Sequence, residues 1–255
     1  MKKYVVYSSV GDTSVHKKWF ECKERLFDIV LCYYGDNDEY YNTLKNLESD
    51  SCIVYRKKGL KWPNFREYCK TIDIYKYSHV WVPDDDIETS GNMINRMFLI
   101  LEKNKHIQVA IPSTTKDSVA GGGTGRRNDN HHCKKVVEYR NFVECGLLCF
   151  HTNICKNSLF QKLLQSTYTG YYFDIALQYC FPLHKRHYSI AVLHTSIVRH
   201  PLRTTKGVLD KVIPRKDHKK DIQKFIKNGI PRYMLQKKMK IYKTIYNTNR
   251  CVLCK

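Results

Sequence analysis

Three consecutive aspartates, Asp84, Asp85 and Asp86, follow the apolar run YSHVWVP. Carboxylates this close repel one another and are costly to bury unless a cation or hydrogen-bond donors offset them. If the run continues as an extended strand, alternating side-chain directions place Asp84 and Asp86 on one side, where they can share a ligand. Hard oxygen ligands suit Mg²⁺ or Mn²⁺ bound jointly with a diphosphate. The alternative is that the aspartates begin a helix, whose dipole favours acidic residues there.

The sequence around these aspartates predicts an α/β domain that holds them at the end of a strand. Short apolar runs rich in β-branched and aromatic residues alternate with helical patterns over residues 1–115. Such alternation is typical of a mainly parallel sheet flanked by helices. We expect buried strands in KYVVYSS, FDIVLCYY, CIVYR, YSHVWVPDDDI, HIQVAIPS, NFVECGLLCFHTNI and YSIAVLHTSIVRHP, and helices over 16–26, 65–75, 92–103, 157–166 and 171–181.

Polar residues gather where these strands are expected to end. Ser8 and Ser9 close the first strand, Tyr34 follows the second, and Lys57 and Lys58 follow the third. In parallel α/β sheets ligands bind beyond the carboxyl ends of the strands, so these residues and the aspartates should share one site. The alternative for the lysines is a solvated basic loop.

Five sequence blocks, in order along the chain, resemble a known family. They are RKKGLKWPNF, YSHVWVPDDDI, NFVECGLLCF, GYYFDIAL and IVRHPLRTTKG. Over about residues 27–207 they look like the glycosyltransferase-like family of plants and bacteria that was long catalogued as a domain of unknown function. The resemblance implies the GT-A fold of nucleotide-diphospho-sugar transferases, with a mixed, mainly parallel α/β sheet flanked by helices.

The resemblance also implies a metal site. Asp84 and Asp86 correspond to the DxD motif, which in the family binds a metal, Mn²⁺ or Mg²⁺, together with the donor diphosphate. Asp85 would contact the ribose or the metal. His200 falls where many GT-A enzymes place a late metal ligand, although a surface histidine at a strand end is the alternative.

Sugar transfer from a nucleotide requires that the negative charge on the leaving diphosphate is neutralised, which basic side chains can do alongside a metal. The lysines after the third predicted strand are placed for this role. The predicted nucleotide-sugar-binding residues are Ser8, Ser9, Tyr34, Lys57, Lys58, Lys61 and Asp85.

On the acceptor side, Asp174 in GYYFDIAL falls where inverting members keep the carboxylate that deprotonates the acceptor hydroxyl. Glu144 aligns with the glutamate of the family's FVE strand and would line the acceptor side. The chain departs from the family at Tyr172 and Phe173, where the block has Gly-Leu after tryptophan, so Tyr172 would shape acceptor preference. A helix N-cap is the alternative role for Asp174.

These features predict a metal-dependent, inverting glycosyltransferase. It would move a sugar from a nucleotide-diphosphate donor to a hydroxyl of a glycan, glycoprotein or lipid-linked acceptor, as in polysaccharide or glycoprotein glycan synthesis. Two alternatives stay open. A nucleic-acid-binding module fits the net charge of +20 and the 19 tyrosines, although no RNP, zinc-finger or helix-turn-helix signature is evident. A metal-dependent nuclease or phosphatase would use similar carboxylates.

The positive charge is concentrated near the C-terminus. Residues 205–255 hold 15 Lys+Arg and three Asp, a net charge of +12, which leaves +8 for the other 204 residues. We therefore divide the chain into a GT-A-like domain over 1–204 and a basic helical extension over 205–255. Apolar residues in IQKFI and YMLQKKMKIYKTIY recur every three or four positions between lysines, as in basic amphipathic helices. These helices could pack on the domain or bind an anionic membrane or another polyanion.

The sequence predicts a cytoplasmic protein, with peripheral membrane contact through 205–255 as an extension of that hypothesis. No run approaches the ~18–20 apolar residues of a membrane-spanning helix, and the first apolar run is too short for a signal peptide. The 11 cysteines are odd in number and many lie in apolar runs, which favours free thiols in a reducing compartment. The CxxC of Cys251 and Cys254 lacks a second pair of zinc ligands. The glycine-rich interval 116–135 is expected to form a loop over the active site.

Overall fold

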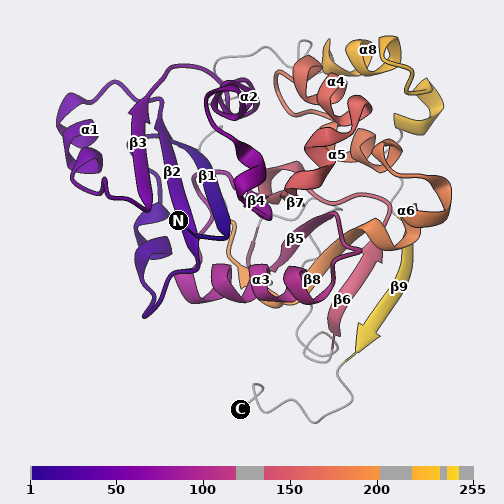
Figure 1. The fold of residues 1–255 in the computed structure, drawn as a ribbon, viewed down its shortest axis with the longest axis horizontal. Helices are drawn as coiled ribbons and strands as arrows, with labels where there is room; N and C mark the ends of the chain where they lie inside the picture. Colours follow the sequence, from indigo (N-terminus) through magenta and orange to yellow (C-terminus); the bar gives the residue numbers. More distant parts are fainter. Residues whose placement is uncertain (1, 119–134, 202–219, 236–239, 247–255) are drawn as a thin grey trace.

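The computed structural model describes residues 2–118, 135–201, 220–235 and 240–246, and these form one mixed sheet with helices on both faces. The strands are β1 (Tyr4–Val10), β2 (Phe27–Tyr33), β3 (Cys52–Arg56), β4 (His79–Trp81), β5 (Val109–Thr114), β6 (Lys135–Arg140), β7 (Cys149–His151), β8 (Ile190–Val198) and β9 (Ile241–Tyr246). Within the described ranges their order is β3-β2-β1-β4-β7-β5-β8-β6-β9 (Figure 1).

Parallel pairing dominates one half of this sheet. Strands β3, β2, β1 and β4 are all parallel. Strand β7 is antiparallel to both β4 and β5, β5 and β8 are parallel, and β6 is antiparallel to β8 and β9. The result is the mixed α/β architecture that the sequence predicts, although antiparallel pairings are as many as parallel ones within the described residues.

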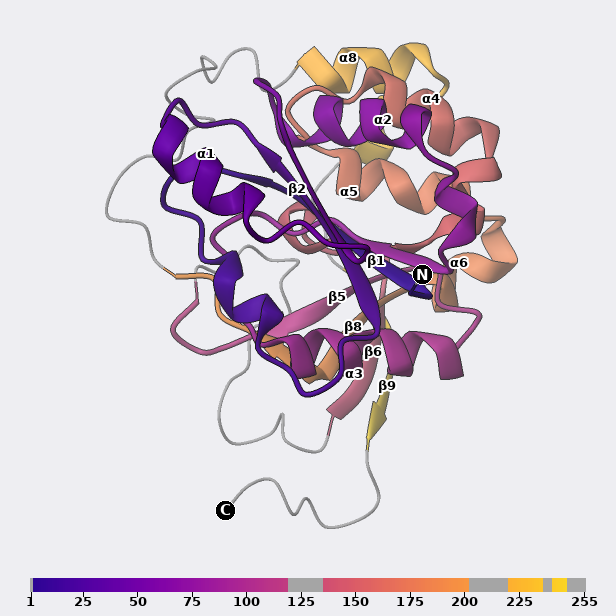
Figure 2. The same cartoon turned by 60° about the vertical axis from the view of Figure 1, so that its left-hand side comes forward.

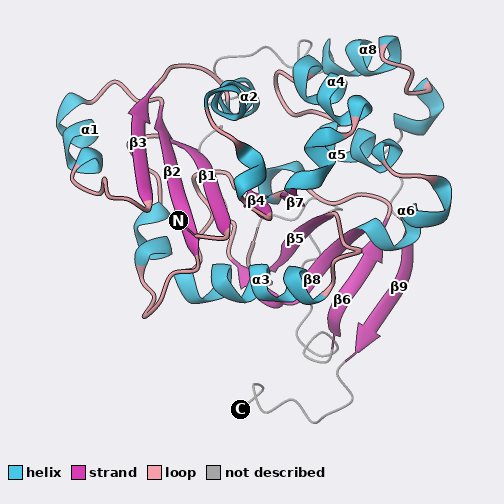
Figure 3. Cartoon of the chain, in the orientation of Figure 1, coloured by secondary structure: helices cyan, strands magenta, loops and turns pink. Residues whose placement is uncertain are grey.

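Helices cover both faces of the sheet. They are α1 (Asp38–Lys45), α2 (Lys61–Thr71), α3 (Gly91–Lys103), α4 (Ser158–Ser166), α5 (Phe173–Ala176), α6 (Leu183–Ser189) and α8 (Lys220–Lys227). Single 3₁₀ turns are η1 (His16–Phe20), η2 (Ile74–Lys76), η3 (Cys145–Leu147), η4 (Thr152–Lys156), η5 (Leu177–Cys180) and η7 (Arg232–Leu235). Figure 2 shows α2, α4, α5 and α8 on one side of the sheet and α3 on the other, and Figure 3 shows the same elements by type.

The register of the first strands brings their carboxyl ends together. Every residue of β1 and β2 is buried, as expected for parallel strands covered on both faces. Val10 of β1 pairs with Tyr33 of β2, so the loops after both strands begin at the same level. Strand β4 stops where Trp81 pairs with Val6, four residues before β1 ends. The chain after Trp81 therefore runs beside the end of β1.

Most predicted elements are confirmed, and their errors are local. The strands in KYVVYSS, FDIVLCYY, CIVYR, HIQVAIPS and YSIAVLHTSIVRHP are present, as are the helices over 92–103 and 157–166. The predicted helix over 16–26 is only the turn η1, and the one over 65–75 begins at Lys61 and ends at Thr71. The segment NFVECGLLCFHTNI forms η3 and the short strand β7, and the predicted helix over 171–181 is split into α5 and η5.

The basic C-terminal segment is partly helical, as predicted, but it also completes the sheet. Helix α8 contains IQKFI, and its apolar face packs on the domain, with Phe225 fully buried. Residues Ile241–Tyr246, predicted to be helical, instead form strand β9 at the sheet edge. That prediction is wrong because the apolar residues in this short run fit both the 3.6-residue period of a helix and the two-residue period of a strand. The division of the chain at residue 204 stays a prediction.

Several sequence features lie outside the described residues, namely most of the glycine-rich interval 116–135, residues 202–219 and the CxxC of Cys251 and Cys254. The cysteines inside the described ranges are all free thiols. In the same ranges, no helix has both the length and the apolar character that crossing a bilayer requires.

Candidate active site

The three aspartates lie in a turn beyond the end of β4. The amide of Ile87 donates to the carbonyl oxygen of Asp84 at 3.4 Å, which closes the turn over Asp85 and Asp86. The amide of Asp84 donates to the carbonyl oxygen of Gly146 at 2.8 Å. Both the extended strand and the helix start considered for these residues are therefore wrong. The turn directs the three carboxylates to different partners.

Asp84 forms an ion pair with Lys61, the first residue of α2. The Nζ of Lys61 donates to Oδ1 of Asp84 at 2.6 Å and lies 3.4 Å from the carbonyl oxygen of Cys145. Burial alone would lower the pKa of Lys61, but the charge and hydrogen bond of Asp84, together with the nearby Cys145 and Asp86, outweigh it and the pKa is raised. Lys61 is therefore a cation beside the turn. Gly146 touches the same carboxylate so closely that an added Cβ would overlap Oδ2 of Asp84.

Asp85 points toward the loops that follow β1 and β2. Its Oδ2 accepts hydrogen bonds from the amide of Gly11 at 3.1 Å and from the hydroxyl of Tyr34 at 2.9 Å. Burial raises the pKa of Asp85, although the hydrogen bonds from Tyr34 and Gly11 oppose the shift. Gly11 in turn lies under the Tyr34 ring, since a Cβ there would be 2.6 Å from the tyrosine oxygen. One carboxylate thus fixes both loops.

Asp86 contacts His200, which lies 114 residues away in the sequence. The Nε2 of His200 is 3.2 Å from Oδ2 of Asp86, and both side chains are mostly buried. A two-way backbone bridge between Glu88 and Arg199, with both hydrogen bonds at 2.8 Å, aligns the segments that carry them. The Arg199 side chain adds ion pairs to Glu88 at 3.0 Å and to Asp117 at 2.6 Å.

Asp174 lies in the first turn of α5 and is buried. Tyr172, whose φ of 66° is left-handed, is the residue that caps this helix, so the N-cap alternative for Asp174 is wrong. Non-glycine residues rarely adopt such a φ and tend to do so at functional sites. The preceding Gly170 leaves no room for a Cβ, which would lie 2.5 Å from Nε1 of Trp62. The Trp62 ring packs edge-on against Phe173 at 4.7 Å, which makes Trp62 a core residue.

The half-buried thiol of Cys145 is close enough to the aspartate turn and to Asp174 to interact with their charges. Burial raises its pKa well above the ordinary value, while the nearby charge of Lys61 opposes the shift. The carboxylates of Asp174, Asp84 and Glu144 are all close enough to raise it further. The predicted base, the first DxD aspartate and the predicted acceptor-side glutamate therefore surround one thiol at the start of η3.

Comparison with solved structures decides the fold. The chain superposes on GalNAc-T7, solved with UDP, GalNAc and Mn²⁺, with a TM-score of 0.56 and 13% identity over 87% of this chain and 48% of that one. It superposes on residues 1–349 of TarS from S. aureus, solved with UDP-GlcNAc, with a TM-score of 0.59 and 10% identity over 92% of this chain and 69% of that one. This chain has the GT-A fold. It spans about half the length of the GalNAc-T7 chain. No protein-family model and no curated protein matches the sequence.

Two side chains at the aspartate turn could coordinate a divalent cation that also binds substrate phosphates. Asp86 and His200 offer a carboxylate oxygen and an imidazole nitrogen that already lie side by side. Among the described residues no group of three or more His, Cys, Asp or Glu side chains could hold a metal ion. Mg²⁺ is usually bound by only a few protein ligands, and substrate phosphates complete its coordination shell. Asp86 and His200 therefore fit a divalent metal such as Mn²⁺ or Mg²⁺. Asp84 is paired with Lys61, and its role as a metal ligand stays a prediction.

The remaining predicted residues surround the turn at different distances from it. Ser8 is fully buried and donates to the carbonyl oxygen of Pro83 at 3.1 Å, so it joins β1 to the turn's leading segment. Ser9 is also buried in β1. Lys58 donates to the carbonyl oxygen of Tyr34 at 2.7 Å and forms an exposed ion pair with Asp36. Lys57 is exposed at the end of β3, with its amide bonded to the last residue of β2.

Sequence reasoning missed four residues: Gly11, Gly146 and Arg199 near the aspartate turn, and Asp221, whose carboxylate accepts hydrogen bonds from the loop before Asp174. Gly11 and Gly146 matter because a side chain approaches each backbone, which no single sequence reveals. Arg199 precedes His200, and its ion pairs with Asp117 and Glu88, 82 and 111 residues away, cannot be read from one sequence. Asp221 lies in the basic segment, where an acidic residue among lysines was the available signal.

Proposed function

We propose that this chain is a glycosyltransferase that transfers a sugar from a nucleoside-diphosphate donor to an acceptor hydroxyl. The GT-A fold supports this class, and two structures that share it were solved with UDP or UDP-GlcNAc. The observation that carries the proposal is the turn at 84–86. Its three carboxylates meet a lysine, a tyrosine with a backbone amide, and a histidine, beyond the carboxyl end of a parallel strand.

Asp86 and His200 would hold the metal, which when bound would supply positive charge to the leaving diphosphate. Lys61 supplies a second, fixed positive charge at Asp84. Preorganised charge of this kind stabilises the transition state because it needs no reorganisation during the reaction. Asp85, through Gly11 and Tyr34, holds the ends of β1 and β2 in the shape that receives the nucleoside.

In the transfer step, the acceptor oxygen bonds to the anomeric carbon of the sugar as the bond from that carbon to the diphosphate oxygen breaks. The acceptor proton passes to the carboxylate of Asp174, and the nucleoside diphosphate leaves with the electron pair of the broken bond. Attack from the face opposite the leaving group inverts the anomeric centre. Burial of Asp174 beside Cys145 keeps water away from the base.

The acceptor would lie between α5 and η3, where Glu144 and Tyr172 flank Asp174. We propose a glycan, a glycoprotein or a lipid-linked acceptor, in polysaccharide or glycoprotein glycan synthesis. Cytoplasmic location, and contact of residues 205–255 with an anionic membrane, stay part of this proposal. Because the apolar face of α8 packs on the domain, that contact would use the exposed Lys224 and Lys227.

A thermal-shift screen of nucleoside diphosphates and nucleotide-sugars, with and without Mn²⁺, tests the proposal. We expect one base to raise the melting temperature, and to do so more strongly with Mn²⁺, because binding to the folded state stabilises it. Release of the nucleoside diphosphate from the matching nucleotide-sugar would then be measured. Asp86→Ala should abolish both responses, whereas Asp50→Ala, an exposed aspartate before β3, should change neither.

Cleavage of a nucleic acid or a phosphomonoester by the wild type, with no response to any nucleoside diphosphate, would instead favour the nuclease or phosphatase alternative. Salt-dependent binding to arbitrary DNA that is unaffected by Asp86→Ala would favour the nucleic-acid-binding alternative.

A further inference from the structure

Asp221, in the basic C-terminal segment, holds the loop that leads to Asp174. The residue lies in the first turn of α8, is fully buried, and comes about fifty residues after the loop in sequence. Its Oδ2 accepts hydrogen bonds from three consecutive amides, those of Tyr168 at 3.0 Å, Thr169 at 2.9 Å and Gly170 at 3.2 Å. The hydroxyl of Thr169 lies 3.1 Å from the same oxygen. Hydrogen bonds to a charged acceptor are stronger than neutral ones, so this is a firm anchor.

The anchored amides are adjacent to the strained part of the loop. Gly170, with a φ of 88°, presses on Trp62, and Tyr172, also at positive φ, begins α5. Residues in such conformations persist only where the surrounding structure over-determines them. Trp62 follows Lys61, the partner of Asp84. The contacts therefore run continuously from Asp221 through Gly170 and Trp62 to the aspartate turn.

The helix that carries Asp221 is itself docked. Phe225 is fully buried, and Asn228 donates to the Ser166 hydroxyl at 2.7 Å at the end of α4. Figures 1 and 2 both show α8 beside α4, on the same side of the sheet as α5. A carboxylate buried this deeply is costly unless hydrogen bonds offset its burial. All four contacts of Asp221 are made by Oδ2 to one loop, whereas Oδ1 has no hydrogen-bond partner among the described residues.

We propose that Asp221 is a positioning residue that fixes the Tyr168–Tyr172 loop and, through it, the approach of the acceptor to Asp174. The inference rests on the proposed function for its catalytic consequence. It gives the basic segment a role in the active site, in place of a role only at a surface.

Hydrogen exchange tests the anchor directly, and transfer kinetics test its consequence. In Asp221→Asn we expect the amides of Tyr168, Thr169 and Gly170 to exchange about tenfold faster or more, because part of their protection is lost. Acceptor-dependent transfer should fall by about tenfold or more, while hydrolysis of the donor and its Mn²⁺-dependent binding stay near the wild-type values.

Two controls separate this from general destabilisation. Lys224→Ala, exposed on the same helix, should change none of these readouts. Phe225→Leu, which loosens α8 but keeps the carboxylate, should lower the melting temperature with a smaller loss of transfer at matched stability. Unchanged exchange in Asp221→Asn would overturn the anchor, and faster exchange with full transfer would overturn its consequence. A wild type without any transfer activity would count against the proposed function and leave the exchange result standing.

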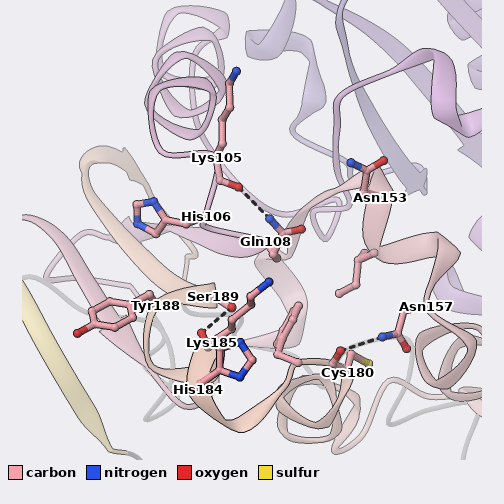
Figure 4. Close-up of a pocket in the computed structure, with 12 residues that line it drawn as sticks. Lys105, His106, Gln108, Asn153, Asn157, Cys180, His184, Lys185, Tyr188 and Ser189 are labelled. Carbon is pink, nitrogen blue, oxygen red and sulfur yellow. Dashed lines mark hydrogen bonds between the residues drawn. The ribbon is translucent and has the colours of Figure 1, made fainter.

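A separate pocket lies at the amino-terminal ends of strands β5 and β8, in the interior of the sheet. It has a volume of about 550 Å³ and lies between the segment before β5, the turn η4 and helix α6 (Figure 4). Its lining residues are Lys105, His106, Gln108, Asn153, Ile154, Asn157, Cys180, Phe181, His184, Lys185, Tyr188 and Ser189. Gln108 and Ser189 directly precede β5 and β8, so the pocket opens where these strands begin, away from the aspartate turn.

The lining is cationic and carries no carboxylate. Among the described residues, neither Lys105 nor Lys185 forms an ion pair, although both are exposed at the pocket. Figure 4 shows Lys185, His184 and Ser189 on one side of the pocket, with Gln108 and Asn153 across from them. The lining also includes the apolar side chains of Ile154 and Phe181. Lysines, imidazoles and amides together with apolar side chains fit a phosphate-bearing small molecule with a ring.

The pocket therefore points to a second site, which we infer binds a sugar phosphate or nucleotide independently of the aspartate turn. Titration calorimetry with glucose 1-phosphate, UMP and inorganic pyrophosphate measures it, in Asp86→Ala protein so that the turn contributes nothing. We expect the double variant Lys105→Ala/Lys185→Ala to weaken the best of these probes about tenfold or more, and Lys227→Ala, an exposed lysine on α8, to change nothing. Sugar phosphate and nucleotide are told apart by which probe binds. The inference would be overturned if Lys105→Ala/Lys185→Ala and Lys227→Ala bound the probe with equal affinity, or if no probe bound at all.

Discussion

The Nε2 of His200 lies 3.2 Å from Oδ2 of Asp86, although 114 residues separate the two in the sequence. The contact depends on the Glu88–Arg199 backbone bridge, which joins the segment after the turn to the end of β8. A carboxylate and an imidazole brought together by a separate backbone link form a preorganised pair. Such a pair is what a cation shared with a diphosphate requires.

His200→Ala should weaken Mn²⁺ binding in the presence of the nucleoside diphosphate. Removing a residue that only hydrogen-bonds to a metal ligand lowers metal affinity by about 10–100-fold. Removing the ligand itself should lower it at least as much. Titration of Mn²⁺ by calorimetry at saturating nucleotide measures the change. His187→Ala, an exposed histidine on α6 outside both proposed sites, is the matched control. Equal Mn²⁺ affinity in His200→Ala and wild type would show that His200 is not a ligand.

Lys61→Ala should impair both stability and transfer. It leaves the Asp84 carboxylate without its cation, which we expect to cost about 1–3 kcal/mol of unfolding free energy. Loss of one preorganised charge should lower kcat by about 10²–10³-fold. Chemical denaturation and single-turnover kinetics measure the two effects. Lys58→Ala, whose ion pair with Asp36 is exposed, should leave the melting temperature unchanged, and a Lys61→Ala enzyme with normal kcat would rule out the proposed role.

The sequence predicts the fold well where a strand is one continuous apolar run. Strands β1, β2 and β8 are such runs and are buried along almost their whole length. Prediction fails where backbone partners are distant in sequence. Strand β4 ends early because the next amides, of Val82 and Asp84, bond to the segment around η3. In β9 the exposed Ile241 and Ile245 alternate with less exposed Tyr242 and Thr244, a period of two that the lysine spacing obscured.

The site divides in the same way. Asp86 and His200 could be paired in advance because they stand in blocks that resemble a family, and the structure brings them together. The role of Asp221 could not be predicted from the sequence, because it consists of four contacts to a loop about fifty residues earlier. Gly146 is likewise important only because the Asp84 carboxylate touches it in three dimensions.

Gly146→Ala should disrupt the site more than the fold. The added methyl group overlaps Oδ2 of Asp84, and forcing an extra methyl group into a packed place costs about 1–3 kcal/mol. We expect the Asp84–Lys61 pair to separate and transfer to fall about tenfold or more. Gly229→Ala is the control, since a Cβ there meets nothing within 4 Å and only the positive φ opposes it. It should lower stability by about 1–2 kcal/mol and leave transfer intact. The reverse pattern would contradict this account of Gly146.

Two buried histidines predict that stability falls in mild acid. Burial lowers the pKa of His79 to about 3 and that of His16 to about 4, from an ordinary value near 6.5. Between pH 6.5 and pH 4 the unfolded chain therefore binds more protons than the folded one, so unfolding free energy decreases as pH falls through this window. His79→Phe should reduce the slope by about one proton, measured by urea denaturation from pH 4 to pH 8. An unchanged slope would mean that His79 is not held neutral.

Asp174→Asn should abolish transfer without affecting donor binding. The carboxamide cannot take the acceptor proton, and general-base catalysis contributes about 10²–10⁴-fold. Because Asp174 lies in α5 while the proposed metal ligands Asp86 and His200 lie in the aspartate turn and after β8, the melting shift produced by nucleotide and Mn²⁺ should match that of the wild type. Glu144→Gln removes the neighbouring carboxylate near Cys145 and is the matched control. If Glu144→Gln loses the larger share of transfer and Asp174→Asn keeps it, the base is Glu144 and the assignment of Asp174 is wrong.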